Sequence, residues 1–547
     1  MLKMKNVGTL FFVLALLFQH AKAQNPVANP FPYGVASGDP LPDRVIIWTC
    51  LRPSTKAATA PGRWQMATDA EMKKVVKKGN FTARLENDFT IKIDVEGLKA
   101  GQTYYYQFES EGQKSLIGRT KTTPTGNIDN VRLAVVSCSN YQAGYFNAYG
   151  RIADRDDLNA VIHLGDYIYE YADGGYGDST LVASKARALQ PATELLTLSD
   201  YRARYATYRL DPDLQRCHQM HPFITVWDDH ESANNAYTDG AENHNEKGKD
   251  EGDWNARQAA ARKAYAEWLP IRGEADRIYR KFTFGNLAEV IMLDTRLEGR
   301  QKQIEDITDP ELYNPERTLL GKVQKAWLLE SLKSAKAQWK VLGNQVMFAE
   351  YNVGWAAAAL PDFSPEKLES LFLDIWDGYP AERAQLIEYL KNEKINDVVI
   401  VTGDVHCAFA YDVALRPSVF SQKGQLPDYD PVTGQGSVAV EFVTPSISAS
   451  NFDENVGKQR AQLFAYQMNK PLPAAPPQNV NPNPHMKFVD LIRHGYFVLD
   501  LRPEKAQADW FFVEDILKKT NQESFAEGWF TRKGENRLQK AASPVQP

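Results

Sequence analysis

Short apolar runs recur along the chain after residue 131, and each is about as long as one buried β-strand. Helical stretches separate several of these runs. In residues 254–269, for example, Trp254, Ala261, Tyr265 and Trp268 recur at helical spacing. This alternation predicts a layered α/β fold with a largely buried sheet. The runs cover residues 133–136, 160–164, 223–227, 290–293, 341–342 and 398–401.

A different pattern precedes these runs. Residues 30–121 contain segments rich in β-branched and aromatic residues, partly in alternation, at 44–48, 88–94 and 103–108. They predict a small all-β sandwich of the fibronectin type III-like kind, joined by the polar, turn-rich segment 121–130 to a catalytic domain over residues 131–530. Two domains also suit a chain of 547 residues, which is too long for one ordinary core.

The first twenty-three residues have the pattern of a secretory signal peptide. Lys3 and Lys5 precede a short apolar segment, and Ala21-Lys22-Ala23 provides small residues for cleavage. The apolar segment is too short to span a bilayer. We therefore expect export to the periplasm or the medium by a Sec-type signal, with no transmembrane span in the mature protein.

Charge and cysteine content narrow the function classes. A net charge of -6 argues against a nucleic-acid-binding surface. Cys50, Cys138, Cys217 and Cys407 are too few and too scattered for a disulfide framework, although one pair could form in an oxidising compartment. Coordination of a metal is one reason for such a thiol to stay free. We expect a monomer.

Polar side chains follow five of the predicted strands. Ligands gather at the carboxyl ends of strands in open α/β sheets, so these segments should meet at one place. Taken singly, each motif has a structural explanation, such as a turn at Asp166 or a core histidine at His406. Together they predict a two-metal site, because carboxylates bridge cations and thiolate or imidazole suits iron or zinc. The segments are 137–140, 165–170, 228–231, 343–345 and 403–406.

These motifs resemble the PhoD-type alkaline phosphatases, a branch of the metallophosphoesterases related to purple acid phosphatases. The resemblance extends over residues 30–450 and is weaker from residue 408 onward. It implies a metallophosphatase-type β-sheet core flanked by helices, preceded by a small β-sandwich. The similar segments are 34–40 with 44–48, 137–140, 163–170, 227–231 with Asn234-Asn235, 339–348 and 402–406.

The resemblance also implies a set of metal ligands. Cys138, Tyr169 and His406 would hold Fe³⁺, with Tyr169 bound as the phenolate. Asp166 would bridge the iron to a second cation, which is Ca²⁺ in this family. The ligands implied on the Ca²⁺ side are Asp404, either Asp229 or Asn234, and Asn344. Tyr167 competes with Tyr169, although the Gly-Asp-x-x-Tyr spacing favours Tyr169.

Further roles concern the reaction itself. The resemblance implies hydrolysis of phosphate mono- or diesters by a metal-bound hydroxide, with His230 stabilising charge or protonating the leaving group. Arg296 could bind a substrate phosphate, but an ion pair with Asp294 or another acid is slightly favoured. For Asp39 and Glu170 the structural interpretation is favoured. The alternatives are a phosphodiesterase for phospholipids or teichoic-acid-like polymers, and a non-catalytic surface protein with structural metals.

One departure from the resemblance concerns export. The best-known secreted members use a twin-arginine signal, whereas Lys3 and Lys5 here are not accompanied by an arginine pair. The sequence therefore predicts that metal loading follows export.

Overall fold

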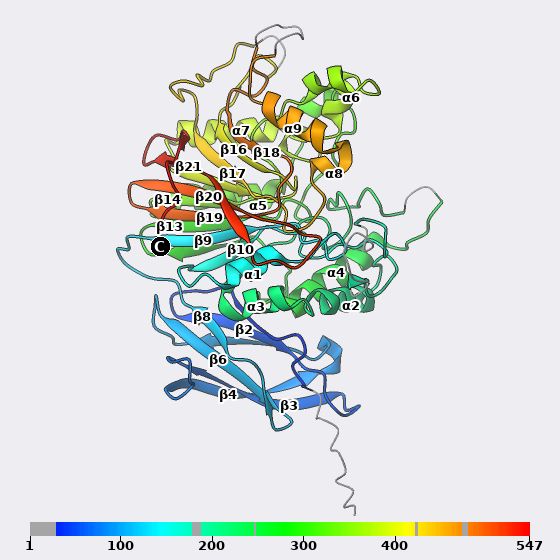
Figure 1. Ribbon diagram of the computed structural model, residues 1–547, viewed down its shortest axis with the longest axis vertical. Helices are drawn as coiled ribbons and strands as arrows, with labels where there is room; N and C mark the ends of the chain where they lie inside the picture. The colour runs from blue at the N-terminus through cyan, green and yellow to red at the C-terminus, as the bar shows by residue number, and fades with distance from the viewer. Residues whose placement is uncertain (1–28, 178–186, 246–247, 422–424, 473–479, 547) are drawn as a thin grey trace, which may run out of the picture.

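Three β-sheets organise the computed structural model, which describes residues 29–177, 187–245, 248–421, 425–472 and 480–546 (Figure 1). The first sheet has ten strands in the order β22 (Gln539–Lys540), β21 (Glu523–Arg532), β20 (Lys505–Val513), β19 (Gly495–Arg502), β9 (Val131–Val136), β10 (Ala160–His163), β11 (Pro222–Thr225), β1 (Val35–Gly38), β2 (Arg44–Cys50) and β5 (Thr90–Glu96). The predicted signal peptide lies outside the described residues.

The second sheet lies against the first. It has seven strands in the order β12 (Arg280–Phe284), β13 (Ala288–Met292), β14 (Trp339–Gly343), β15 (Val398–Thr402), β17 (Ala439–Val443), β16 (Ala408–Val413) and β18 (Met486–Asp490). Side chains from both sheets, among them Val135, Val399 and Phe442, form one buried cluster. Trp510 on β20 donates its indole hydrogen bond to the carbonyl of Val443 at 3.1 Å, which ties the two layers together.

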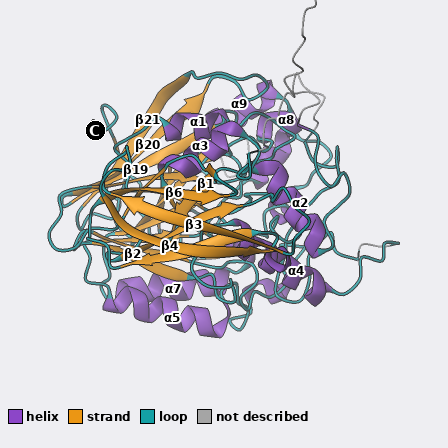
Figure 2. Cartoon of the chain, turned by 90° about the horizontal axis from the view of Figure 1, so that it is seen from below, coloured by secondary structure: helices purple, strands orange, loops and turns teal. Residues whose placement is uncertain are grey.

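Helices cover the outer faces of this pair of sheets. Figure 2 shows α5 and α7 on one side of the strands and α1 and α3 on the other. Leu328 of α5 and Leu386 of α7 pack against the second sheet in a separate apolar cluster. The helices are α1 (Asn147–Ala153), α2 (Leu198–Tyr208), α3 (Pro212–Met220), α4 (Trp254–Trp268), α5 (Gly321–Ser334), α6 (Pro365–Ser370), α7 (Pro380–Asn392), α8 (Phe452–Val456) and α9 (Lys458–Gln467).

The third sheet belongs to the N-terminal all-β region at the bottom of Figure 1. Its strands are β4 (Val75–Arg84), β3 (Thr59–Ala67), β6 (Thr103–Ser110) and β7 (Gln113–Lys114), with β8 (Gly118–Lys121) paired to β6. Apolar side chains of this sheet, such as Tyr106 and Phe108, pack against Val45 and Ile47 of β2.

The N-terminal strands are continuous with the larger two-sheet core. Strand β1 pairs in parallel with β11, with Ser37 opposite Pro222 and Gly38 opposite Phe223. The first sheet therefore runs without a break from the N-terminal region into the core. This pairing was not expected from the sequence, because it joins segments that are far apart in the chain.

The α/β fold class predicted from the sequence is confirmed. Each predicted core strand overlaps a strand of the structure, and α4 occupies the predicted helical segment. The C-terminal strands were not predicted, and β19 to β22 extend the first sheet as an antiparallel meander. Within the described residues, no helix is long and apolar enough to cross a membrane.

Candidate metal centre

The candidate site lies where the carboxyl ends of strands from both sheets meet. Strands β9, β10 and β11 run parallel in the first sheet, as do β14, β15 and β17 in the second. Ser137 and Ser446 form a β-bridge between the loops of the two sheets. A Cβ on Gly403 would lie 2.7 Å from Cβ of Ser137, so the close approach of these loops requires a glycine.

Four side chains at these strand ends are aimed by unusual backbone conformations. Positive φ angles occur at Cys138 (60°), Asp166 (54°), Asp404 (63°) and His406 (64°). Left-handed backbone is uncommon for residues other than glycine, and it persists only where the surrounding structure enforces it. These residues therefore occupy strained positions of the kind that gather at functional sites.

The first donor group combines sulfur, oxygen and nitrogen. One ligand atom each from Cys138, Asp166 and His406 lies within 4.8 Å of the others. The hydroxyl of Tyr169 lies 3.1 Å from Oδ2 of Asp166 and 3.3 Å from Nε2 of His406. Nδ1 of His406 lies 2.7 Å from the carbonyl oxygen of Ser450, which leaves Nε2 facing the group.

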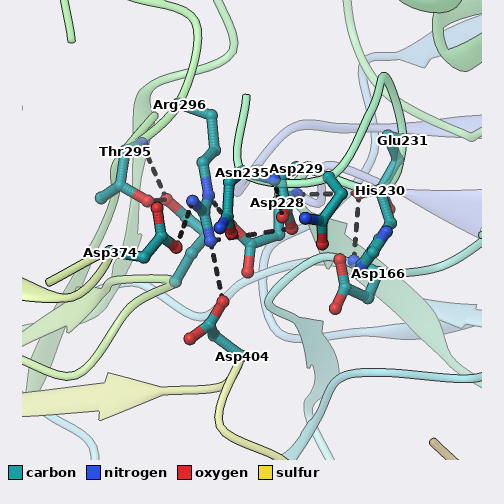
Figure 3. Close-up of polar contacts among 12 residues, drawn as sticks. Asp166, Asp228, Asp229, His230, Glu231, Asn235, Thr295, Arg296, Asp374 and Asp404 are labelled. Carbon is teal, nitrogen blue, oxygen red and sulfur yellow. Dashed lines mark hydrogen bonds and ion pairs between the residues drawn. The ribbon is translucent and has the colours of Figure 1, made fainter. Parts of the chain in front are cut away.

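Two more donor groups overlap with the first. Asp166, Asp229 and His230 form one, and within each group the ligand atoms again lie no more than 4.8 Å apart. Asp228, Asp229 and Asp404 form the other, seen at the centre of Figure 3. Because Asp166 and Asp229 each belong to two groups, the donors form a continuous chain across the site.

Three buried carboxylate oxygens of these donor groups have no hydrogen-bond partner. They are Oδ1 of Asp166, Oδ2 of Asp228 and Oδ1 of Asp229. Burial, together with neighbouring carboxylates, raises the pKa of Asp166 and of Asp228 well above the ordinary value. Unsatisfied buried carboxylates are unfavourable unless a cation or a hydrogen bond compensates them. The residues present therefore fit a bound cation.

The sulfur, phenol and imidazole donors are uncharged in the absence of a cation. Burial raises the pKa of the Cys138 thiol and of the Tyr169 phenol, and it lowers the pKa of His406 to about 4. His406 is thus a neutral imidazole, the form that binds metals. The thiol and the phenol must lose their protons when they bind a cation, and a positive charge at the site favours that loss.

His230 stands beside the oxygen-rich part of the site. Its Nδ1 lies 2.7 Å from Oε2 of Glu170, and its ring centroid lies 4.3 Å from that of Tyr169. Although burial opposes protonation, Asp229 and Glu170 raise the pKa of His230 well above its ordinary value. The second oxygen of Glu170 accepts from Asn243 at 2.9 Å, so this carboxylate is fixed on both sides.

Glu231 organises the backbone around the site. Its carboxylate accepts hydrogen bonds from the backbone amides of Asp166 at 3.0 Å, Tyr167 at 2.6 Å and Asp228 at 2.8 Å. It thereby ties the loop after β10 to the loop after β11. The close approach of these loops also depends on Gly165, whose φ is 105° and where a Cβ would lie 2.3 Å from the amide nitrogen of Asp228.

Asn234, Asn344 and Tyr167 make hydrogen bonds to residues outside the three donor groups. The side-chain amide of Asn234 donates to Glu242 at 3.2 Å. Oδ1 of Asn344 accepts from the indole of Trp376 at 3.1 Å. The hydroxyl of Tyr167 lies 2.9 Å from Nε2 of His218, away from the donor groups, whereas Tyr169 reaches them.

Arg296 and Asp39 are engaged in ion pairs. The guanidinium of Arg296 contacts Asp228, Asp374 and Asp404. Asp294 instead accepts from the backbone amides of Arg296 and Leu297. Asp39 pairs with Arg280 at 2.6 Å, in line with its structural interpretation.

Three residues around the donor groups are not indicated by the sequence patterns. They are Asp374, which contacts both Arg296 and Arg300, Arg300 itself, and Glu231 as an acceptor for backbone amides. Asp374 and Arg300 follow no predicted strand directly, so the strand-end pattern could not indicate them. Glu231 belongs to the segment 228–231, but its position in the sequence does not indicate that its carboxylate binds backbone amides.

The comparisons with known proteins place the chain in a family. Residues 133–510 match the PhoD-like phosphatase family, and residues 18–124 match the PhoD-like phosphatase N-terminal domain. The chain is 34% identical over 543 residues to alkaline phosphatase D of Bacillus subtilis (strain 168), covering 96% of this chain and 85% of that protein. A solved structure described as the structure of PhoD is 33% identical, with a TM-score of 0.78, and covers 94% of this chain and 93% of its own.

These matches extend over both sheets of the core and over the N-terminal region. They include every residue of the three donor groups. The chain is a phosphoric ester hydrolase, and it belongs to the PhoD-like phosphatase family.

Proposed function

We propose that this enzyme is an exported, metal-dependent phosphatase that hydrolyses phosphate mono- or diesters with two cations that share Asp166. The observation that carries this proposal is the chain of overlapping donor groups, in which Asp166 belongs both to the group with Cys138 and His406 and to the group with Asp229 and His230. A shared carboxylate is the usual bridge between two cations that act on one phosphate.

The chemistry of the donors suggests which cation each side binds. Thiolate, phenolate and imidazole from Cys138, Tyr169 and His406 suit Fe³⁺. Carboxylate oxygens from Asp229 and Asp404 suit Ca²⁺. We favour Asp229 over Asn234 as the oxygen ligand, because the amide of Asn234 faces Glu242 whereas Oδ1 of Asp229 is buried without a hydrogen-bond partner.

The protein groups around the cations have separate tasks in the proposed reaction. Bound cations would lower the pKa of a water molecule toward neutrality and neutralise charge on the phosphate oxygens. His230 is held at Nδ1 by Glu170, so its Nε2 is the nitrogen left to donate a proton or a hydrogen bond to the leaving oxygen. The charge on Asp229 and Glu170 keeps His230 protonated for this task.

Metal analysis together with a panel of substrates tests the proposal. Purified protein is expected to contain iron and calcium and to hydrolyse aryl and alkyl phosphate monoesters or diesters, with loss of activity after chelation and recovery on adding both metals. Protein that is fully active without bound metal contradicts the metal dependence. A strong preference for phospholipid or polyol-phosphate diesters would favour the alternative substrate class.

Export is tested separately. Cleavage after Ala23 would give a mature protein that begins at Gln24. N-terminal sequencing of the protein recovered from the periplasm or the medium is expected to find this start. Retention of the uncleaved protein inside the cell contradicts the proposed signal peptide.

A further inference from the structure

Arg296 is a fully buried arginine whose three guanidinium nitrogens all contact carboxylates. Nε donates to Oδ1 of Asp228, one terminal nitrogen donates to Oδ2 of Asp374 at 2.6 Å, and the other donates to Oδ1 of Asp404 at 2.7 Å. Figure 3 shows the guanidinium between these acids. These contacts use three of the five guanidinium N–H groups and pair its charge with buried carboxylates, which disfavours a further role in binding a phosphate.

This guanidinium occupies the space among the acids of the third donor group. The spacing of Asp228, Asp229 and Asp404 would suit a metal ion. Arg296, however, hydrogen-bonds two of these carboxylates and lies 3.6 Å from Oδ1 of Asp229. Buried carboxylates are unfavourable unless a cation or hydrogen bonds compensate them, and here Arg296 supplies both.

Arg296 is anchored on the side away from the donor groups. Asp374 accepts from Arg296 through one oxygen and from Arg300 through the other. Arg300, also fully buried, donates to the backbone carbonyls of Asp374 at 2.7 Å and Thr295 at 2.9 Å. The guanidinium of Arg296 is therefore held in place by acids of the third donor group on one side and by Asp374 on the other.

We propose that Arg296, anchored by Asp374 and Arg300, is a positioning residue that balances part of the negative charge of the third donor group and orients Asp404 toward the second metal. It holds acids of this group instead of binding the substrate phosphate. This inference rests on the proposed two-metal function, and it assigns to Asp374 and Arg300 a role in setting the affinity of the second site.

The physical consequence follows from the charges. If Asp374 loses its charge, Arg296 loses one anchor and its charge shifts toward Asp404 and Asp229. A cation at the second site is then repelled more strongly, and the orientation of Asp404 is lost. Residues that orient metal ligands typically change metal affinity by about 10–100-fold when they are mutated.

The test compares Asp374→Asn with Asp377→Asn as the matched control. Asp377 lies three residues away, has a similarly small exposure (17% against 15%) and pairs with Arg383, but no contact joins it to the three donor groups. Both variants and the wild type are depleted of calcium under conditions that leave iron bound, and they are then titrated with Ca²⁺ by calorimetry. Iron content, kcat, KM and the thermal midpoint are measured alongside.

The expected result is Ca²⁺ binding about 10–100-fold weaker in Asp374→Asn, with unchanged iron content and KM measured at saturating Ca²⁺. Asp377→Asn should keep the affinity of the wild type even if its thermal midpoint falls. Arg300→Lys keeps the positive charge but loses the branched guanidinium that contacts Asp374 and Thr295. It should weaken Ca²⁺ binding to a smaller extent. This second variant covers the case in which Asp374→Asn does not fold.

Three other outcomes would each contradict a different part of these proposals. If the wild type binds Ca²⁺ but Asp374→Asn and Arg300→Lys bind it equally well, the positioning role is wrong while the proposed function stands. The same holds if Arg296→Lys raises KM and leaves Ca²⁺ affinity unchanged, because that pattern identifies a phosphate-binding arginine. If the wild type binds no divalent cation at all, the two-metal function itself fails.

Discussion

Nδ1 of His230 lies 2.7 Å from Oε2 of Glu170, and both side chains are buried next to the acids of the donor groups. Glu170 also accepts from the backbone amide of Asn234 at 2.7 Å and from the side chain of Asn243. A carboxylate fixed in this way sets both the orientation and the charge of the imidazole. The sequence alone favoured a purely structural role for Glu170, and the contact with His230 gives that role a consequence for the reaction.

The first prediction concerns this pair. His230→Asn should lower kcat by about 10²–10³, the effect of removing one donor that stabilises developing charge. Glu170→Gln keeps the shape but removes the charge that orients His230, so it should lower kcat by a smaller factor and leave KM nearly unchanged. Steady-state kinetics at saturating metal checks both. If Glu170→Gln lowers only the thermal midpoint, Glu170 has no part in positioning His230.

The second prediction concerns the shared carboxylate. Asp166→Asn should abolish metal loading and activity together, because Asp166 is the residue that links the first two donor groups. Asp156→Asn, at an exposed position of the same part of the chain, is the control and should behave like the wild type. Metal content by mass spectrometry and turnover are measured on the same samples. Full turnover in Asp166→Asn would rule out the bridging role.

The third prediction separates two tyrosines of one motif. Coordination of Tyr169 to Fe³⁺ should give a violet or red-brown colour by charge transfer from the phenolate. Tyr169→Phe should lose this absorption, whereas Tyr167→Phe should keep it, because the Tyr167 hydroxyl is bonded to His218. Visible spectra of both variants at equal iron content decide the matter. A colourless wild-type protein that contains iron would contradict phenolate ligation.

Much of the donor set could be located in the sequence because it follows strands. Cys138, Asp166 and His406 each come within a few residues of a predicted strand, and parallel strands bring their carboxyl ends to one edge. Local patterns are sufficient for such residues. The structure brings these three side chains together, although Cys138 and Asp166 follow strands of the first sheet and His406 follows a strand of the second.

The remainder depends on contacts that local patterns do not encode. Asp374 lies in a turn after α6, and only the tertiary fold carries it to Arg296 and Arg300. The pairing of β1 with β11 joins residues about 185 positions apart, so no periodicity within either strand could indicate it. The orientation of Asn234 toward Glu242 likewise depends on the loop that carries both residues.

A last prediction concerns acid stability and involves a histidine far from the donor groups. His221 is buried, its Nε2 lies 3.0 Å from the carbonyl oxygen of Ile152, and burial lowers its pKa to about 3. The unfolded chain binds a proton at this residue below its ordinary pKa of about 6.5, and the folded chain does not. Stability is therefore lost as the pH falls from about 6.5 toward 3, by about 2 kcal/mol at pH 5.

His221→Gln removes this titration while keeping a side-chain donor near Ile152. Its free energy of unfolding should fall less between pH 7 and pH 5 than that of the wild type, by about 2 kcal/mol. Urea unfolding at both pH values measures the difference, and comparing each protein with itself cancels any loss of stability that the substitution causes at pH 7. Equal falls in the two proteins would mean that His221 is protonated in the folded state or that the unfolded chain shields it. The direction of the effect follows from burial and from the nearby charge of Arg119, because both disfavour the protonated imidazole and together they outweigh the hydrogen bond to Ile152.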